Sequence, residues 1–410
     1  MNIRFFISVS IVISSIISCS GSSDSDDSGV KNPIPTPSPT TGITTANVRN
    51  YMVDPAATTE TVALFYNLKK NAESQILLGH QDAFYQYYKN DNSASDVKKT
   101  TGSDPALIGL DLMFITDKSN EDISWNWFYQ QQQKITAAAK EAFDKGLAVT
   151  FAWHLREPYK EDHFYTSEMT SEQKTKAFKS ILPGGENHEW YKKKLDKVAS
   201  IFTGLVGTNG QKIPVIFRPF HEFDGDWFWW GSKYCTADEY KQVFQFTVKY
   251  LKETKNVHNV LFAFSPDASF KSSNQYLERY PGDEYVDILG MDNYQDFANQ
   301  SSAGVSTANS KLKIISDLAK TKNKIAALTE TGYVSSNSVA RTAAHFTTLV
   351  YPAITNNNIE IAYICFWANS EKEYFVPTPG TSYENDFKNF SMMSKMKLQT
   401  GLTKSLYKLL

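Results

Sequence analysis

The chain has 410 residues, with 42 lysines and arginines against 44 aspartates and glutamates, so its formal net charge is −2. This balance argues against a nucleic-acid-binding protein, which normally carries a basic face. Three cysteines are too few for a disulfide scaffold or a four-cysteine zinc site. Aromatic residues make up 14% of the chain, a surplus that needs an explanation.

Residues 1–18 have the features of an export signal peptide. Arg4 precedes an apolar run, residues 5–17, that is too short to cross a bilayer as a helix. The run ends in Ile16-Ile17-Ser18-Cys19, which resembles a bacterial lipobox and implies a lipid on Cys19. A simple secretory peptide with an incidental cysteine is the alternative. A lipid would anchor the protein to a membrane without a transmembrane helix.

Residues 19–46 are predicted to be a disordered tether. A Ser-Asp run follows Cys19, and four prolines then alternate with other residues between positions 33 and 39. A polar, proline-spaced segment cannot bury a core. The acidic run resembles the export tag of surface lipoproteins in some Gram-negative bacteria. We therefore expect a lipid-anchored protein of the outer membrane, on either the cell surface or the periplasmic face.

Residues 47–410 are predicted to form one catalytic domain of the α/β class. Short apolar runs alternate with helix-length amphipathic stretches, which is typical of parallel strands joined by crossover helices. The expected strands are Ile76–His80, Ala106–Ile115, Leu147–His154, Pro214–Glu222, Asn259–Asp267, Val286–Tyr294, Lys324–Gly332 and Ile359–Trp367. The expected helices include Trp125–Asp144, Glu189–Leu205, Ala237–Lys255, Ser310–Thr321 and Val339–Thr355.

Eight such strands predict a (β/α)8 TIM barrel with enlarged βα loops, the longest being residues 155–189. No glycine-rich dinucleotide or phosphate loop opens a helix, which excludes a Rossmann fold. The two cysteines of this domain, Cys235 and Cys365, lie far apart in the chain and are expected to be buried free thiols.

Two carboxylates close expected strands on opposite sides of the barrel mouth. Glu222 ends the fourth run and Glu330 the seventh, and catalytic residues of such barrels lie at the carboxyl ends of the strands. A pair of carboxylates flanking a glycosidic bond is what its hydrolysis requires. A salt bridge at the rim is the alternative for either glutamate alone.

The segment after Glu222 concentrates aromatic side chains. Six of them fall within twelve residues: Phe223, Trp227, Phe228, Trp229, Trp230 and Tyr234. Flat rings on a cleft wall suit the apolar faces of sugars, whereas a core corner would bury them. We expect two of the six to be buried and the others to face the cleft.

The segment Arg218–Trp230, RPFHEFDGDWFWW, resembles the acid/base signature of glycoside hydrolase family 26, which consists chiefly of endo-β-1,4-mannanases. The later segment Leu328–Gly332, LTETG, resembles the nucleophile strand of that family. Weaker matches spread the resemblance across the catalytic domain, at Gly79-His80-Gln81, Trp153-His154, Ile181–Gly185, Met291–Tyr294 and Phe366-Trp367.

This resemblance implies a retaining endo-hydrolysis of β-1,4-mannosidic linkages in mannan, glucomannan or galactomannan. Glu222 would be the general acid/base and Glu330 the nucleophile of a double displacement. The substrate-binding set that it implies is His154, His221, Trp227, Tyr294, Trp367 and Arg218. Tyr294 would hydrogen-bond the nucleophile, and together with Arg218 it would keep Glu330 charged.

The chain departs from the family pattern at two places. Some members have an arginine directly after the tryptophan of the eighth strand, where this chain has Ala368, so the choice between endo and exo action stays open. Arg156 and Glu157 stand where small residues are expected, and we predict that they pair with each other.

Other kinds of site receive little support. The seven histidines show no tight ligand spacing, so no metal and no cofactor are predicted. Asp111, Asp267 and Asp292 follow strands and are interpreted as helix caps rather than substrate contacts.

Two other functions remain open: the same fold acting on β-glucan or β-xylan, and a glycan-binding surface lipoprotein without catalysis. The latter should lack one of the two glutamates. We expect a monomer whose partners are its polysaccharide substrate and, through the lipid, a membrane.

Overall fold

The computed structural model describes residues 42–332 and 344–409, so the predicted signal peptide, Cys19 and nearly all of the predicted tether lie outside it. Gly42–Leu410 form one compact unit. Ile43 and Val48 are already buried, so packing begins before the predicted domain start at residue 47. Among the described helices, none has the length and apolar content needed to span a bilayer.

The centre of the unit is a closed ring of parallel strands. The strands are β1 (Ile76–Gln81), β2 (Leu107–Asp111), β3 (Ala148–Ala152), β4 (Val215–Arg218), β5 (Val260–Phe264), β6 (Ile288–Leu289), β7 (Asp292–Asn293), β8 (Ile325–Ala326), β9 (Leu328–Thr331) and β10 (Tyr363–Phe366). Their order is β7-β9-β10-β1-β2-β3-β4-β5-β6-β8. Because β6 and β7 are two halves of one strand, as are β8 and β9, the order closes on itself. The predicted (β/α)8 barrel is confirmed.

Except for β1, which extends one residue further, each strand is shorter than its apolar run. Pro219 follows β4 and has no backbone N–H to continue the ladder. Phe220 and Glu222 then take left-handed backbone angles, each with φ of +53°, which is uncommon for residues other than glycine. Glu222 therefore lies on a turn beyond β4 rather than on the strand itself.

Helices surround the ring. The larger ones are α1 (Thr59–Asn71), α2 (Asp96–Thr101), α3 (Trp127–Asp144), α4 (Ser171–Ser180), α5 (His188–Gly204), α6 (Ala237–Lys249), α9 (Ser302–Thr321) and α11 (Glu384–Ser391). The shorter α7 (Ser273–Leu277), α8 (Gln295–Ala298) and α10 (Tyr351–Thr355) complete the set, and β11 (Met396–Lys397) pairs with β1. Of the predicted helix Val339–Thr355, residues 339–343 lie outside the described residues.

Local chemistry explains several helix starts. Thr170 and Gln173 form a capping box at α4, and Thr236 and Glu239 form another at α6, so the first backbone donors of both helices are satisfied. The helix α4 lies inside the long loop after β3 that the sequence predicted only as an insertion.

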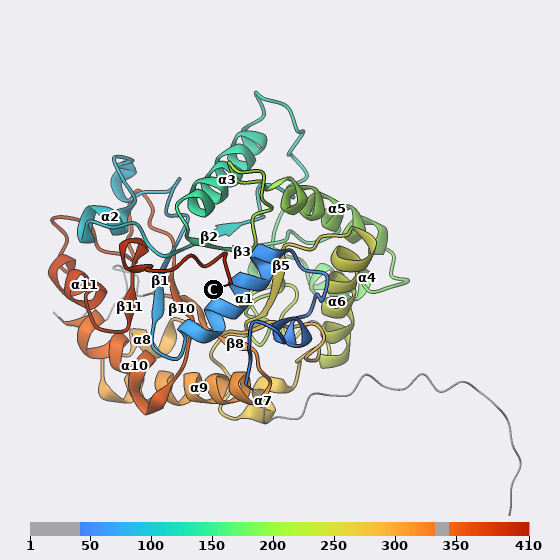
Figure 1. Cartoon of the computed structure of the whole chain (residues 1–410). Coiled ribbons are helices and arrows are strands. Elements are labelled where there is room, and N and C mark those ends of the chain that lie inside the picture. Colours follow the sequence, from blue (N-terminus) through green and yellow to red (C-terminus); the bar gives the residue numbers. More distant parts are fainter. Residues whose placement is uncertain (1–41, 333–343, 410) are drawn as a thin grey trace, which may run out of the picture. The chain divides into compact units, whose positions relative to one another are not determined.

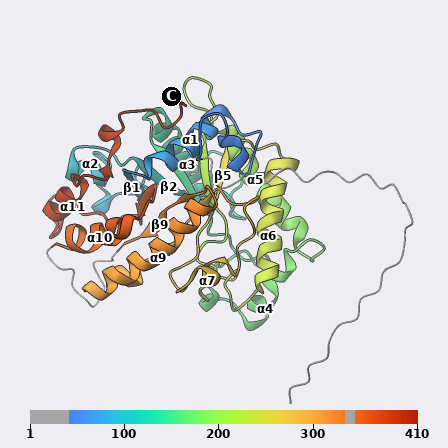
Figure 2. The same ribbon diagram turned by 60° about the horizontal axis from the view of Figure 1, so that its bottom comes forward.

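The helix α1 covers the amino-terminal end of the barrel. Lys69 donates to the backbone oxygens of Ala319 and Lys324, at the end of α9 and just before β8. In Figure 1 α1 crosses the middle of the ring of helices, and in Figure 2 it lies at the end opposite α4 and α7. Since α4 and α7 follow β3 and β5, the other end of the barrel is left for the site.

Close strand approach at Gly79 gives a testable consequence. A Cβ at Gly79 would lie 2.9 Å from the backbone oxygen of Ile364 in β10 and 2.7 Å from Leu107 Cδ2. We expect Gly79→Ala to lower the free energy of unfolding by about 1–3 kcal/mol, measured by urea denaturation. Gly204→Ala, at the end of α5 where a Cβ meets nothing within 4 Å, should be neutral or stabilising. Equal stabilities for the two variants would contradict the close approach.

Candidate active site

A buried arginine organises the mouth of the barrel. Arg218, the last residue of β4, donates from Nη1 to both carboxylate oxygens of Asp292 at 2.8 Å. Its Nη2 donates to Oε2 of Glu330 at 2.7 Å. Burial acts to lower the pKa of Arg218, but the two carboxylates outweigh it and raise the pKa above the ordinary value. Arg218 is thus a fixed positive charge that joins β4, β7 and β9.

Glu330 receives a second donor on its other oxygen. The hydroxyl of Tyr294, one residue past β7, donates to Oε1 of Glu330 at 2.6 Å. Each oxygen of Glu330 thus accepts one hydrogen bond. Burial and the neighbouring Glu330 charge raise the pKa of Tyr294 well above its usual value, so the phenol keeps its proton. The predicted donors of Glu330 are the two that the structure shows.

Glu222 has the opposite environment. Its Oε2 accepts one hydrogen bond, from Nε1 of Trp227 at 2.6 Å. Burial, followed by the charges of Glu330, Asp292 and Asp267, raises the pKa of Glu222 well above the ordinary value of 4.5. The two glutamates therefore have different partners within the same site, one indole N–H for Glu222 and a guanidinium and a phenol for Glu330.

The two glutamates line one cavity of ≈ 330 Å³. Of the predicted site residues, the cavity also includes His154, Trp227, Tyr294 and Trp367, whereas Arg218 and His221 lie buried beneath it. The remaining lining residues are Tyr165, Phe228, Asp267, Gln295 and Phe375. A cleft with two carboxyl groups, aromatic walls and a few hydrogen-bonding groups suits an uncharged polyhydroxylated ligand.

Tyr165 and Phe375 were not predicted from the sequence. Tyr165 belongs to the long loop after β3, and its ring stacks on that of Phe228 with a centroid distance of 5.4 Å. The backbone N–H of Thr166 donates to the oxygen of Trp227 at 2.7 Å. No motif marks either residue, because their place in the cleft depends on how long loops fold back.

Two histidines lie in contact at the base of the cleft, His154 lining it and His221 beneath it. Their pKa values are shifted in opposite directions. The Nδ1 of His154 hydrogen-bonds Oδ2 of Asp111 at 2.5 Å. Burial acts to lower the pKa of His154, but Asp111 overrides it and the pKa is raised. His221, whose ring centroid is 4.6 Å from that of His154, has a pKa far below the ordinary value because of burial and the nearby positive groups.

The interpretation of the strand-end aspartates as helix caps was wrong for all three, since Asp267 lines the cleft and α7 is capped by Ser272. Asp111 binds His154, and Asp292 binds Arg218 and also accepts from the Thr329 hydroxyl at 2.7 Å. The helices that follow use other caps, such as Asn126 for α3. A sign in the sequence was available, since a strand-end aspartate in a buried apolar run needs a partner.

The aromatic loop contributes less to the cleft than expected. Only Trp227 and Phe228 of its six aromatic residues line the cavity. Trp229 and Trp230 are fully buried, and their indole N–H groups donate to the backbone oxygens of Leu155 and His221. The expectation that four of the six face the cleft was wrong, because the loop folds inward and packs its own rings.

Arg156 and Glu157 do not pair with each other. The Nε of Arg156 contacts Oδ2 of Asp117 at 2.5 Å. Glu157 is buried and accepts from the backbone N–H groups of Tyr159 and Lys160. Arg156 joins its loop to the loop after β2, whereas Glu157 fixes a turn within its own loop. Cys235 and Cys365 are free and buried, as predicted.

Among the described residues, one trio has atoms close enough to share a metal ion. His221, Asp292 and Glu330 each bring one potential ligand atom within 4.8 Å of the others. Both carboxylates already bind the guanidinium of Arg218, so a cation would have to compete with that charge. The residues therefore do not suit a divalent metal.

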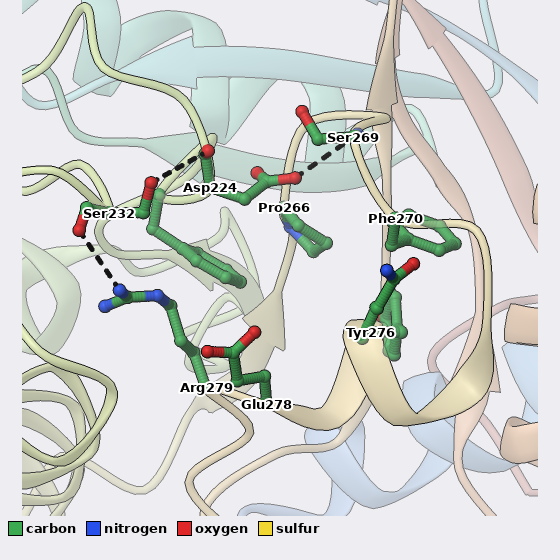
Figure 3. A pocket seen from close by; sticks show the side chains of 10 residues that line it. Asp224, Ser232, Pro266, Ser269, Phe270, Tyr276, Glu278 and Arg279 are labelled. Atoms are coloured by element: carbon green, nitrogen blue, oxygen red, sulfur yellow. Dashed lines mark hydrogen bonds between the residues drawn. The ribbon is translucent and has the colours of Figure 1, made fainter. Parts of the chain in front are cut away.

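A second cavity of ≈ 330 Å³ lies beside the cleft, between the segments that follow β4 and β5. Figure 3 shows Asp224 directed toward Ser269, whose backbone N–H donates to it at 3.3 Å. The backbone N–H of Asp267 donates to the other oxygen at 2.5 Å. Burial, with a contribution from Asp267, raises the pKa of Asp224 to about 7. Asp224 thus ties the acid-bearing turn to the loop that carries Asp267.

Comparisons with known proteins agree with this geometry. Residues 53–360 match the model of glycosyl hydrolase family 26. Over 357 residues the chain is 34% identical to a mannan endo-1,4-β-mannosidase of Bifidobacterium adolescentis, covering 83% of this chain but 35% of that protein.

Solved structures agree as well. GH26C of a Muricauda species is 52% identical, with a TM-score of 0.88 over 90% of this chain and 98% of that one. A family 26 β-mannanase of Bacteroides ovatus is 31% identical, with a TM-score of 0.75 over 86% of this chain and 98% of that one.

The raised pKa of Glu222 predicts how stability depends on pH. The folded state favours the protonated carboxyl of Glu222. The stabilising contribution of this carboxyl is therefore present below its unfolded pKa and is lost as the pH rises through its folded pKa. Glutamine stays neutral at every pH. Between about pH 4 and about pH 9, the free energy of unfolding of Glu222→Gln should rise relative to that of the parent by at least about 1 kcal/mol, measured by urea denaturation.

Glu172→Gln serves as the control for that measurement. Glu172 forms an exposed ion pair with Lys176 in α4, and such pairs contribute roughly 0–1 kcal/mol. This variant should show no gain at high pH. A stability difference between Glu222→Gln and the parent that is the same at both pH values would contradict a neutral Glu222.

Proposed function

The chain belongs to glycoside hydrolase family 26, and on this basis we propose that it hydrolyses internal β-1,4-mannosidic bonds of mannan, glucomannan or galactomannan with retention. The observation that carries the proposal is the unequal pair of glutamates in one cleft. Glu222 has a raised pKa, and Glu330 is bound by Arg218 and Tyr294.

The first step needs an acid and a nucleophile at the same bond. Glu222 is protonated and transfers its proton to the glycosidic oxygen as the bond breaks. The charged Glu330 attacks the anomeric carbon and forms a glycosyl-enzyme intermediate. Arg218 and Tyr294 orient the attacking carboxylate, since each binds a different oxygen of Glu330.

The second step reverses the roles. Glu222, now ionised, takes a proton from water, which attacks the anomeric carbon and releases Glu330. The loss of charge on Glu330 in the intermediate lowers the repulsion that raises the pKa of Glu222, so a base is available when it is needed. Retention follows from two successive displacements.

The walls of the cleft offer aromatic faces and a hydrogen-bonding histidine to a sugar chain. Trp227, which also binds Glu222, offers a ring face on the acid side, and Trp367 offers another on the far wall. His154, held through Nδ1 by Asp111, presents its other ring nitrogen to a substrate hydroxyl. His221 is buried between His154 and Trp230, and it supports the site through packing.

The choice of mannan rests on the relatives. The Bifidobacterium adolescentis protein is named a mannan endo-1,4-β-mannosidase, and the Bacteroides ovatus structure is a β-mannanase. The chain covers 35% of the length of the first, so the whole activity is inferred from the shared domain. β-Glucan and β-xylan are the alternatives, and a non-catalytic glycan-binding protein is disfavoured by the presence of both glutamates.

We also propose that Cys19 carries a lipid and that the protein is a monomer anchored to the outer membrane, facing the cell surface or the periplasm. The lipobox-like segment before Cys19 and the acidic run after it support this location. The intervening residues would let the catalytic domain reach a polymer beyond the membrane surface.

Removal of the nucleophile tests the activity. Glu330→Ala should lower kcat on mannan by about a thousandfold or more, because it removes the carboxylate that forms the glycosyl-enzyme intermediate. Reducing-sugar release from mannan, β-glucan and xylan, measured side by side, tests catalysis and sugar preference together. Lys176→Ala, in the exposed ion pair of α4, should keep parental activity.

The stereochemistry gives an independent check on the same prediction. Proton NMR of the first products of the parent enzyme should show the β-anomer. An initial α-anomer, or substantial activity in Glu330→Ala, would contradict the double displacement. Faster hydrolysis of β-glucan or xylan than of mannan would contradict the assigned substrate.

The anchor has a separate test. When the full chain is expressed with its signal in a Gram-negative host, Cys19→Ala should move the protein from the membrane fraction to the soluble fraction. Cys235→Ala, which changes a buried thiol of the catalytic domain, should leave the distribution unchanged. Membrane association that persists in Cys19→Ala would contradict the lipid on this residue.

A further inference from the structure

Trp125, in the loop before α3, and Trp127, the first residue of α3, are both more exposed than the cleft residue Tyr165, which is 43% exposed. Trp125 is 77% exposed and Trp127 is 52% exposed. Trp153, Trp229 and Trp230 are, by contrast, fully buried. The exposed surface of these two indoles (the tryptophan patch) is accounted for by neither the barrel core nor the cavity with the glutamates.

The loop that presents these rings is held in one conformation. The side-chain amide of Asn120 donates to the backbone oxygens of Phe114 and Ile115 and to Gln132 of α3. Asn126, between the two tryptophans, donates to the oxygen of Ser119 at 2.8 Å and caps α3 by accepting from Tyr129. The exposed rings are therefore presented on a rigid support.

The position of Trp127 is further set by aromatic contacts. Its ring lies edge-on to Phe114 and Phe128, with centroid distances of 5.1 Å and 5.0 Å. Half of the indole remains open to solvent despite these contacts. A preorganised ring face binds a ligand with little loss of side-chain entropy.

This loop begins at the catalytic end of the barrel. It follows Asp111, whose carboxylate binds the cleft residue His154. The hydroxyl of Thr116 accepts from Trp153, and Asp117 binds Arg156, so the loop packs on the residues either side of His154. The loop that leads to the patch is thus joined to residues behind one wall of the cleft.

The charges around the patch are largely paired. Asp117 pairs with Arg156, Lys118 with Asp162, and Asp122 with Lys197. A ligand for this surface needs flat apolar faces and little charge. A neutral polysaccharide has both properties, because the axial C–H groups of a pyranose form an apolar face.

We infer that Trp125 and Trp127 form a second sugar-stacking surface, outside the cleft, that binds a distant stretch of the same β-linked mannan chain that the cleft cleaves. This inference rests on the proposed function. The tryptophan surface would hold long chains near the cleft, so its effect should depend on the length of the substrate. Oligosaccharides that fill only the cleft should not use it.

The test compares the full chain of the parent with that of the double variant Trp125→Ala/Trp127→Ala. In a Glu330→Ala background, the double variant should bind mannan polymer about tenfold more weakly in affinity electrophoresis. With Glu330 restored, KM for polymer should rise several-fold, while kcat/KM on short mannooligosaccharides stays at the parental value.

Two further variants keep the test decisive. Trp125→Phe/Trp127→Phe should recover much of the affinity, since a smaller flat ring remains. Met392→Ala removes another exposed apolar side chain, 67% exposed, near β11 and the opposite end of β1, and should bind like the parent. Thermal unfolding of each variant shows whether the fold is retained.

The outcomes separate this inference from the proposed function. Parental binding and KM on polymer in the folded double variant would overturn the second surface and leave the mannanase function intact. An equal loss on polymers and short oligosaccharides would also overturn it, because the loop would then act on the cleft. A parent that neither binds nor cleaves mannan would overturn both.

Discussion

The guanidinium of Arg218 lets two carboxylates share the mouth of the barrel. Asp292 and Glu330 lie on neighbouring strands, both buried, and two unscreened negative charges there would repel each other strongly. Arg218 reaches across from β4 and binds both. The free-energy cost of burying the three charges is offset only because Arg218 binds both carboxylates. Loss of one partner would leave a buried, unpaired charge.

The guanidinium of Arg218 also gives the two glutamates different surroundings. Glu330 has a cation and a phenol as donors, whereas Glu222 has one indole N–H and several negative neighbours. Two identical side chains therefore have different hydrogen-bond partners in one cleft. The unusual backbone at Glu222, with φ of +53°, places it beyond β4, facing the cavity rather than in the ladder.

The aromatic surplus has several uses. Most of the rings build the core, as shown by the stacked and edge-on contacts among Phe178, Phe220, Tyr240 and the two buried tryptophans of the loop after β4. A smaller group lines the cleft, where Tyr165, Trp227 and Trp367 come from three different loops. Trp125 and Trp127 stand apart from both groups because more than half of each side chain is exposed.

The barrel and the pair of glutamates at its mouth could be predicted from the residue pattern alone. Eight apolar runs separated by helix-length stretches are typical of a closed parallel sheet, and glutamates that end the fourth and seventh runs lie at the carboxyl ends of strands. The pairing of Arg218 with Asp292, the dyad of Asp111 with His154 and the entry of Tyr165 into the cleft were decided only by the tertiary structure. These contacts join residues far apart in the chain. No local pattern records them, because their energies depend on which charges and rings the folded loops bring together.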